Sequence, residues 1–456
     1  MTLNRREFLR SGAATGALLL GDPFRARAAI DRYGTSRASR LFPGTFLAHA
    51  DLHNHSLYSD GDGDARQVFA SMRDAGLDVV ALTDHSTLSY GLSDSPCPGR
   101  QFDCQSLAGI DEETWARTRR LADLHHHENR FVSIRGFEWS SPTLGHMNVW
   151  FSERWIDPLH TAGLGKGEGA GDFAHREGDI PQELTDPLDA IIAGVPLGDL
   201  SMNPFYQWLQ RPPETPLLEG GLDGIVGFNH PGREPGRFSF FAFNAMVEPR
   251  LVSMEIFNRR EDYLFEGTDT GVQSPLVQCL EAGWRTGLLG VTDEHGTDWG
   301  FPDGKGRGGL WVSELTRNGV REAMLDRRFF ATNQKGLRVD AAANGVRMGR
   351  SLSHASGPVE FQVDVDRGPD WHGKSLQVQV LRPGTLLPEV IANALVTVPN
   401  PDQPVISFTA NVDITSGGWM VLRVSDPEQP ADSRAAGIWP GFGKAIAYTS
   451  PWWLQV

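Results

Sequence analysis

The segment Asp51–Asp60 constrains this chain most: it reads DLHNHSLYSD and closely follows the apolar run Phe46-Leu47-Ala48. An apolar run of this kind is typical of the end of a strand. Residues two apart in an extended segment point to the same face, so His53 and His55 can reach one ion. Imidazoles and a carboxylate such as Asp60 are suitable ligands for Zn, Mn or Fe. The segment predicts a metal site at a strand end; two exposed loop histidines are the alternative.

The same arrangement recurs along the first two thirds of the chain. Possible ligands stand at or just beyond the ends of further apolar runs, in the segments Thr83-Asp84-His85, Gly136-Phe137-Glu138, Leu144–Asn148 (with His146), Asn229–Gly232 (with His230) and Asp293-Glu294-His295. Helical patterns at Ala65–Ala75 and Asp111–Asn129 alternate with these runs. Such alternation predicts parallel strands with crossover helices. In a βα barrel the carboxyl ends of the strands converge on one rim, so we expect the side chains to gather there.

The remaining elements define the expected architecture. Strands are predicted at Asp78–Thr83, Arg130–Trp139, Ile225–Phe228, Leu251–Phe257, Thr286–Val291 and Gly309–Val312. Residues 157–220 are rich in Gly, Pro and Asp, and we interpret them as an insertion that forms part of a substrate lid, with disorder as the alternative. After Gln334 short alternating runs are separated by Gly, Pro, Asp or Asn without a helical period. This pattern predicts a β-sandwich over residues 335–456.

Composition excludes some classes of function. The chain has 456 residues and a formal charge of −15, which disfavours a general nucleic-acid-binding protein because phosphate contacts need a basic surface. No run of about 18 apolar residues suits a membrane span, so we expect none in the mature protein. The cysteines Cys97, Cys104 and Cys279 form no zinc-finger pattern. Cys97 and Cys104 lie in one loop, where a disulfide in an oxidising compartment and two unpaired thiols are the alternatives.

The N-terminus predicts export. Asn4–Arg10 contains two adjacent arginines and precedes the weakly apolar run Ser11–Gly21, and Ala26-Arg27-Ala28 supplies small residues for cleavage. Residues 1–28 therefore resemble a twin-arginine signal peptide. An amphipathic helix is the alternative, which the glycines in this stretch disfavour. We expect the twin-arginine export machinery to deliver the folded, metal-loaded protein to the periplasm or the exterior.

These motifs together resemble one known family. DLHNHSLYSDG, ALTDH, GFE, GH, NHPG and TDEH resemble the polymerase-and-histidinol-phosphatase (PHP) superfamily of metallohydrolases over about residues 46–332. The segments Arg328–Thr332, Asn344–Gly349 and Thr449–Trp452 resemble its carbaryl-hydrolase-like (CehA/McbA-type) branch. The resemblance implies a distorted seven-stranded βα (TIM-like) PHP barrel over residues 45–334, followed by the β-sandwich.

The resemblance also implies two to three divalent ions (Zn, Mn or Fe). The implied first ion is held by His53, His55, Glu138 and Asp293; the second by Glu138, His146 and His230; the third by Asp60, His85 and His295. Some members of the family have histidine where this chain has Asp60. Catalytic roles would fall to Glu138, Asp293 and His230.

The expected function is hydrolysis of a small-molecule substrate by a metal-activated water. No G-x-S-x-G elbow suggests a covalent nucleophile. A phosphomonoester or phosphodiester is the leading substrate, and a carbamate, amide or carboxylic ester is the alternative. A phosphoesterase needs cationic contacts beyond the metals, for which Arg233, Arg259 and Arg260 are candidates, with surface salt bridges as the competing interpretation. A metal-containing carbohydrate- or surface-binding protein without turnover is the alternative from another class.

Overall fold

The computed structural model describes residues 34–86, 109–141, 144–158, 201–215, 219–232, 237–398, 404–413, 417–430 and 444–456. Several predictions lie outside these residues: the signal peptide (1–28), most of the insertion (157–220), the pair Cys97 and Cys104, and Arg233. Among the helices that the structure does describe, none combines the length and apolar character that crossing a membrane requires.

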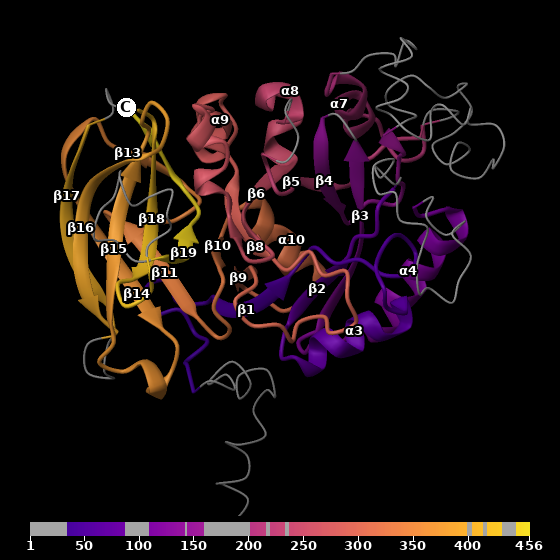
Figure 1. Cartoon of the computed structure of the whole chain (residues 1–456), viewed down its shortest axis with the longest axis horizontal. Helices are drawn as coiled ribbons and strands as arrows, with labels where there is room; N and C mark the ends of the chain where they lie inside the picture. Colours follow the sequence, from indigo (N-terminus) through magenta and orange to yellow (C-terminus); the bar gives the residue numbers. More distant parts are fainter. Residues whose placement is uncertain are drawn as a thin grey trace, which may run out of the picture.

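The strands of the first two thirds of the chain form one sheet (Figure 1). They are β1 (Phe46–Asp51), β2 (Val79–Leu82), β3 (Val132–Ser141), β4 (Gly145–Trp150), β5 (Ile225–Phe228), β6 (Leu251–Asn258), β7 (Glu261–Asp262), β8 (Gly287–Val291), β9 (Arg307–Val312) and β10 (Phe329–Thr332). The order is β10-β9-β1-β2-β3-β4-β5-β6-β7, and β8 pairs with β6. The predicted parallel pairing is confirmed for β1–β2, β2–β3, β5–β6 and β6–β8.

Parallel pairing is wrong elsewhere in this sheet. The pairs β3–β4, β4–β5, β9–β1 and β10–β9 are antiparallel. Only residues 142–144 connect β3 to β4, whereas a parallel neighbour needs a crossover of about a dozen residues or more. The segment around His146 was expected to lie beyond a strand end, and the structure shows it at the start of strand β4.

Strand β8, which pairs with β6, also lies close to β9 and β10. A Cβ added to Gly290 of β8 would lie 2.3 Å from the carbonyl oxygen of Arg307 in β9 and 2.9 Å from that of Thr332 in β10. No hydrogen-bonded ladder joins β8 to these two described strands. Glycine permits this close backbone approach because it has no side chain. The sheet is thus part of a mixed α/β fold, and its description as a seven-stranded barrel stays a prediction.

Helices flank this sheet. They are α3 (Ala65–Asp74), α4 (Glu112–His125), α7 (Asn203–Gln210), α8 (Arg237–Phe241), α9 (Pro275–Glu281) and α10 (Arg317–Leu325), with 3₁₀ turns η3 (Glu248–Arg250), η4 (Tyr263–Phe265) and η5 (Thr268–Thr270). A further 3₁₀ turn, η6 (Pro369–Trp371), lies among the C-terminal strands. The predicted helix α3 is confirmed, with Val68, Phe69 and Met72 buried on one face. A capping box between Asp111 and Thr114 starts α4, because each residue's side chain satisfies the other's backbone N–H.

The last third of the chain is made of strands, as the alternating pattern predicts. They are β11 (Arg338–Ala343), β12 (Val346–Arg347), β13 (Ser351–Ser353), β14 (Ser356–Asp366), β15 (Ser375–Arg382), β16 (Glu389–Thr397), β17 (Ile406–Asp413), β18 (Trp419–Asp426), β19 (Lys444–Thr449) and β20 (Trp452–Gln455). One group forms a separate sheet with the order β12-β11-β14-β17. The other, β16, β15, β18 and β19, continues the sheet described above because β19 pairs with β10. Side chains from both groups share a hydrophobic core that includes Phe361, Val378 and Trp452. The β-sandwich assignment and its boundary at residue 335 stay predictions.

Candidate metal centre

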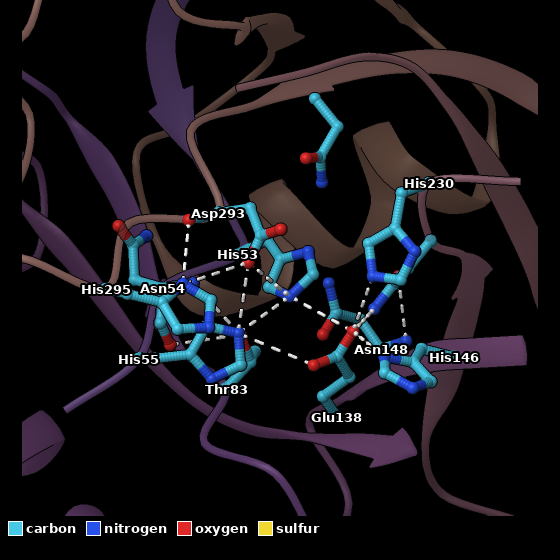
Figure 2. Close-up of polar contacts among 12 residues, drawn as sticks. His53, Asn54, His55, Thr83, Glu138, His146, Asn148, His230, Asp293 and His295 are labelled. Carbon is cyan, nitrogen blue, oxygen red and sulfur yellow. Dashed lines mark hydrogen bonds and ion pairs between the residues drawn. The ribbon is translucent and has the colours of Figure 1, made fainter. Parts of the chain in front are cut away.

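Nine histidine and acidic side chains converge at one end of the sheet. Figure 2 shows His53, His55, Glu138, His146, His230, Asp293 and His295 pointing toward one another. His53, His55 and Asp60 follow β1, His85 follows β2, Glu138 lies in β3, His146 lies in β4, His230 follows β5, and Asp293 and His295 follow β8. His146 joins this group because β4 runs antiparallel to β3, so that the start of β4 lies beside the end of β3. The structure thus brings together every residue that the sequence indicates as a metal ligand.

Glu138 occupies the middle of this cluster and is fully buried. Its Oε1 lies 3.2 Å from each of three ring nitrogens, namely His53 Nε2, His146 Nδ1 and His230 Nε2. Its Oε2 lies 2.7 Å from His85 Nδ1 and 3.4 Å from His55 Nε2. One carboxylate therefore contacts five imidazoles, which is the arrangement expected of a ligand shared between ions.

Three sets of ligand atoms lie close enough to hold an ion. They are His55, Asp60, His85 and His295; His53, His55 and Asp293; and His85, Glu138 and His146, with the ligand atoms of each set within 4.8 Å of one another. Nitrogen and carboxylate oxygen donors of this kind suit Zn, Mn or Fe. The chemistry of the donors therefore fits divalent cations.

The sets overlap more than the family resemblance implies. His55 belongs to the set with Asp293 and also to the set with Asp60, whereas the resemblance gives it to the first ion alone. His85 likewise groups with Glu138 as well as with Asp60. The assignment of each residue to an individual ion stays a prediction.

Glu255 supports two of these histidines and was missed by the sequence analysis. Its Oε1 lies 2.8 Å from His53 Nδ1, and its Oε2 accepts hydrogen bonds from the backbone N–H of His230 at 2.7 Å and from Asn258 Nδ2 at 2.8 Å. A hydrogen bond at Nδ1 directs the lone pair of Nε2 toward the cluster. The available signal was the single charged residue in the strand sequence LVSMEIFN.

Other polar side chains hold the backbone around the cluster. Asn229 donates from Nδ2 to Glu138 Oε1 at 2.7 Å. Asp84 accepts from the backbone and hydroxyl of Ser56 at 2.6 and 2.8 Å, and Asp51 accepts from the backbone N–H of Thr292 at 3.1 Å. These contacts fix the loops that carry the ligands.

Arg259 is the cation that the structure places at this centre. Its Nε lies 3.2 Å from Asp293 Oδ2, its Nη2 lies 3.2 Å from His295 Nδ1, and 40% of its side chain is exposed. Arg260, its neighbour, is exposed, and no described contact joins it to the cluster. Of the three arginines that the sequence indicates, one therefore meets the site, one does not, and Arg233 lies outside the described residues.

The protonation of the cluster reflects its density of charge. Burial disfavours a charged ring at His85, but Asp60 and Glu138 outweigh it and raise the pKa of His85 to about 10. Burial, together with the positive charges of His295 and His85, lowers the pKa of His55 to about 3. Burial opposes ionisation of Glu138, yet the neighbouring imidazoles hold the pKa of its carboxyl well below the ordinary value. In the metal-free chain, protons therefore supply part of the positive charge that bound cations would supply.

Backbone strain coincides with the site. His230 has φ 22°, Asp293 has φ 47° and Arg259 has φ 53°. Non-glycine residues rarely adopt such values, and the surrounding contacts must hold them there. The strain is consistent with side chains that are aimed at a common point at some cost in stability.

Comparison with known proteins gives limited similarity. No family model matches the chain, and no curated protein matches it. A two-domain protein from Bacteroides vulgatus, described as containing a predicted PHP-like metal-dependent phosphoesterase, has a TM-score of 0.39 at 16% identity over 91% of this chain and 100% of its own. A proposed metal-dependent phosphoesterase from Bifidobacterium adolescentis has a TM-score of 0.26 at 13% identity, over 55% of this chain and 88% of its own.

A third solved structure is an amidohydrolase from Chromobacterium violaceum with bound sulfate and no metal. Its TM-score is 0.24 at 14% identity, over 55% of this chain and 88% of its own. Similarity at these levels assigns neither an activity nor a substrate to this chain. We therefore infer function from the geometry of the cluster.

Proposed function

We propose that this chain is a metal-dependent hydrolase of the PHP type and that it acts on phosphoesters. The observation that carries the proposal is the buried Glu138, whose two oxygens contact five imidazoles. Four of these imidazoles also belong to the three overlapping sets of possible metal ligands. A buried group of this composition is costly unless it binds cations or protons. Two to three divalent ions, of Zn, Mn or Fe, are the cofactors that this donor set suits.

The ions, when bound, supply a Lewis acid for the scissile group and a water of lowered pKa. The chain's own residues hold the ligands and exclude bulk water. Glu255 directs His53 through Nδ1, and Asn229 fixes Glu138 Oε1. Because these partners are buried with the ligands, the cluster needs little reorganisation when substrate arrives.

Substrate approaches from the side of His295 and Arg259. The side chains of His53 and Glu138 are 0% exposed, whereas those of His295 and Arg259 are 23% and 40% exposed. His295 Nδ1 lies 3.0 Å from the Asp293 carbonyl oxygen, and donation to it leaves Nε2 with the lone pair. A protonated Nδ1 cannot accept from Arg259 Nη2. While Arg259 Nε pairs with Asp293, Nη2 is therefore available to donate to an anionic substrate oxygen.

This cation favours a phosphoester over a neutral carbonyl substrate. A carbamate, amide or carboxylic ester remains the second candidate, because the same donors polarise a carbonyl oxygen. Arg259 is the discriminating residue. A phosphoryl group is anionic in the ground state and in the transition state, whereas a neutral ester acquires negative charge only in the transition state.

The remaining parts of the proposal concern organisation and location. Residues 1–28 are a twin-arginine signal peptide, residues 45–334 form the PHP barrel with a lid at 157–220, and residues 335–456 form a β-sandwich of the carbaryl-hydrolase-like branch. The protein is exported to the periplasm or the exterior. Support comes from the N-terminal arginine pair and from the alternating runs after Gln334.

The test combines metal analysis with a substrate panel. The mature protein is purified, its metal content is measured, and 4-nitrophenyl phosphate, bis(4-nitrophenyl) phosphate, 4-nitrophenyl acetate and an aryl carbamate are assayed. We expect bound divalent metal, phosphoester turnover, and loss of turnover in His230→Ala and Asp293→Asn. His354→Gln is the matched control, since His354 contacts the carbonyl of Val412 away from the cluster. Bound metal without turnover on any substrate would support the binding-protein alternative, and absence of metal would refute the proposal.

A further inference from the structure

A buried polar network joins the last third of the chain to the sheet that carries the metal centre. The hydroxyl of Tyr448 in β19 donates to Asp262 Oδ2 at 2.8 Å, and Arg423 Nε in β18 donates to the Tyr448 hydroxyl at 3.1 Å. Arg423 Nη1 also donates to Gln379 Oε1 and Ser425 Oγ, both at 2.7 Å. All five side chains are buried.

Such a network costs free energy in the core between strands. Every residue of β18 is buried, and Arg423 is 1% exposed, so the guanidinium and the Asp262 carboxylate are both removed from water. Buried charges of this kind often stabilise no more than an apolar replacement, and their best-attested benefit is a fixed geometry. The network therefore indicates a neighbouring element whose geometry it fixes.

That element is the hairpin of β6 and β7. Asp262 pairs with Phe257 and Glu261 pairs with Asn258, so Arg259 and Arg260 form the turn. Phe257 also packs against Tyr448, with ring centroids 5.2 Å apart. The Tyr448 hydroxyl and ring therefore contact both strands of the hairpin, at the residue pair Phe257 and Asp262 close to the turn.

The turn itself lies at the metal centre. Arg259 contacts Asp293 and His295 there, and its backbone adopts the left-handed φ of 53°. Backbone hydrogen bonds from Arg259 N to the Val291 carbonyl at 3.2 Å and from Gly306 N to the Arg259 carbonyl at 2.8 Å complete the attachment. A left-handed arginine is strained, so contacts on both sides of the turn are needed to hold it.

We propose that Tyr448 is a positioning residue, through which the C-terminal strands hold Arg259 in place to contact the anionic group of the substrate. The inference rests on the proposed function and extends it, because it gives the C-terminal strands a role in substrate recognition. Tyr448 touches neither ligands nor substrate; it acts through Asp262 and the turn.

The chemistry of Tyr448 suits a permanent contact. Burial and the neighbouring Asp262 carboxylate raise the pKa of Tyr448 well above its ordinary value. The hydroxyl therefore stays protonated and donates to Asp262 throughout the neutral and moderately alkaline range. Tyr448→Phe removes this donor and keeps the ring that packs on Phe257.

The experiment measures binding of inorganic phosphate to the metal-loaded mature protein by calorimetry. The variants are Tyr448→Phe, Arg259→Gln, the double variant, and Tyr206→Phe as the matched control. Tyr206 is another buried tyrosine, whose hydroxyl donates to the Ala242 carbonyl at 3.1 Å instead of to the hairpin. We expect Tyr448→Phe to weaken phosphate binding about three- to tenfold and Tyr206→Phe to leave it unchanged.

The double variant separates positioning from a general structural effect. If Tyr448 acts through Arg259, phosphate binds the double variant no more weakly than it binds Arg259→Gln. Equal losses in both backgrounds, or wild-type binding by Tyr448→Phe, would overturn the inference. If Tyr448→Phe fails to fold, Asp262→Asn replaces it under the same criterion, because a neutral amide is a weaker acceptor than a carboxylate.

Failure of the inference and failure of the proposed function give different results. A wild-type protein that holds its metals and hydrolyses phosphoesters, but shows no dependence on Tyr448, refutes only the positioning role. A wild-type protein that holds metal but does not bind phosphate refutes the anion contact of Arg259 and with it the role of Tyr448. A protein without metal refutes the proposed function itself.

Discussion

The substitution Glu255→Gln tests how the cluster holds its ions without touching a ligand. Glu255 accepts from His53 Nδ1 on one oxygen, and from the His230 backbone and Asn258 Nδ2 on the other. Glutamine has the same shape but only one oxygen. Whichever way its amide is turned, its NH₂ group faces a donor: His53 in one orientation, His230 and Asn258 in the other.

The expected magnitude follows from this lost acceptor. Groups that orient metal-binding histidines typically change metal affinity by about 10- to 100-fold, which corresponds to about 1.4–2.8 kcal/mol. The upper part of this range is expected here, because Glu255 is 1% exposed and water cannot replace the lost contact. The loss should fall on the ions that His53 and His230 hold and spare the set around Asp60.

The assay is competition for Zn²⁺ against a chromophoric chelator, with the number of bound ions followed during the titration. Glu294→Gln is the matched control: Glu294 lies at the same end of the sheet and is also buried, but its carboxylate pairs with Lys305 and accepts from Gly296 N. A Glu255→Gln protein that binds all its ions within twofold of the wild-type affinity would show that the orientation of His53 is set by something other than Glu255.

Three further predictions concern stability and reactivity. Chelation should lower the melting temperature, and the chelated protein should lose stability as pH rises from about 6.5 toward 10. The sign follows because the pKa of His85 is raised to about 10 in the folded protein. The stabilisation from its bound proton is complete below the unfolded pKa and is lost as pH rises through the folded pKa. A melting temperature that rises over this interval would contradict this reasoning. Burial raises the pKa of the Cys279 thiol to about 12. In a variant without Cys97 and Cys104, iodoacetamide at pH 8 should therefore label Cys279 only after denaturation. Rapid labelling of the native protein would show that the thiol is accessible. Asp111→Ala removes the cap of α4 and should lower the free energy of unfolding by about 1 kcal/mol in urea titration, whereas an unchanged midpoint would mean that α4 is held by packing alone.

Part of the ligand cluster could be predicted from the sequence because the spacing within two pairs of ligands is local. His53 and His55 lie two apart after an apolar run, and Asp293 and His295 repeat the pattern, so the extended backbone alone aligns each pair. The same runs gave β5 with its bounds unchanged and β6 within one residue. Local pattern is informative wherever strand ends and ligands coincide.

The parts that were missed depend on long-range pairing. The antiparallel strand β4 could not be inferred from parallel alternation, because it arises from the short connection after Ser141. Glu255 was overlooked because its partners, His53 and the His230 backbone, are distant in sequence. The sharing of His55 and His85 between sets of ligands depends on distances that no spacing rule supplies.

The sheet itself explains how strands far from every ligand motif can affect the site. β19 pairs with β10, β10 pairs with β9, and β9 pairs with β1, whose end carries His53 and His55. Hydrogen-bonded strands therefore run without a break from the C-terminal part of the chain to the ligands, across the sequence position where composition suggests a domain boundary (Figure 1). The change in composition shows where the helical patterns end, but strand pairing continues across it. Tyr448, one residue before the end of β19, lies where this continuous sheet can act on the turn that carries Arg259.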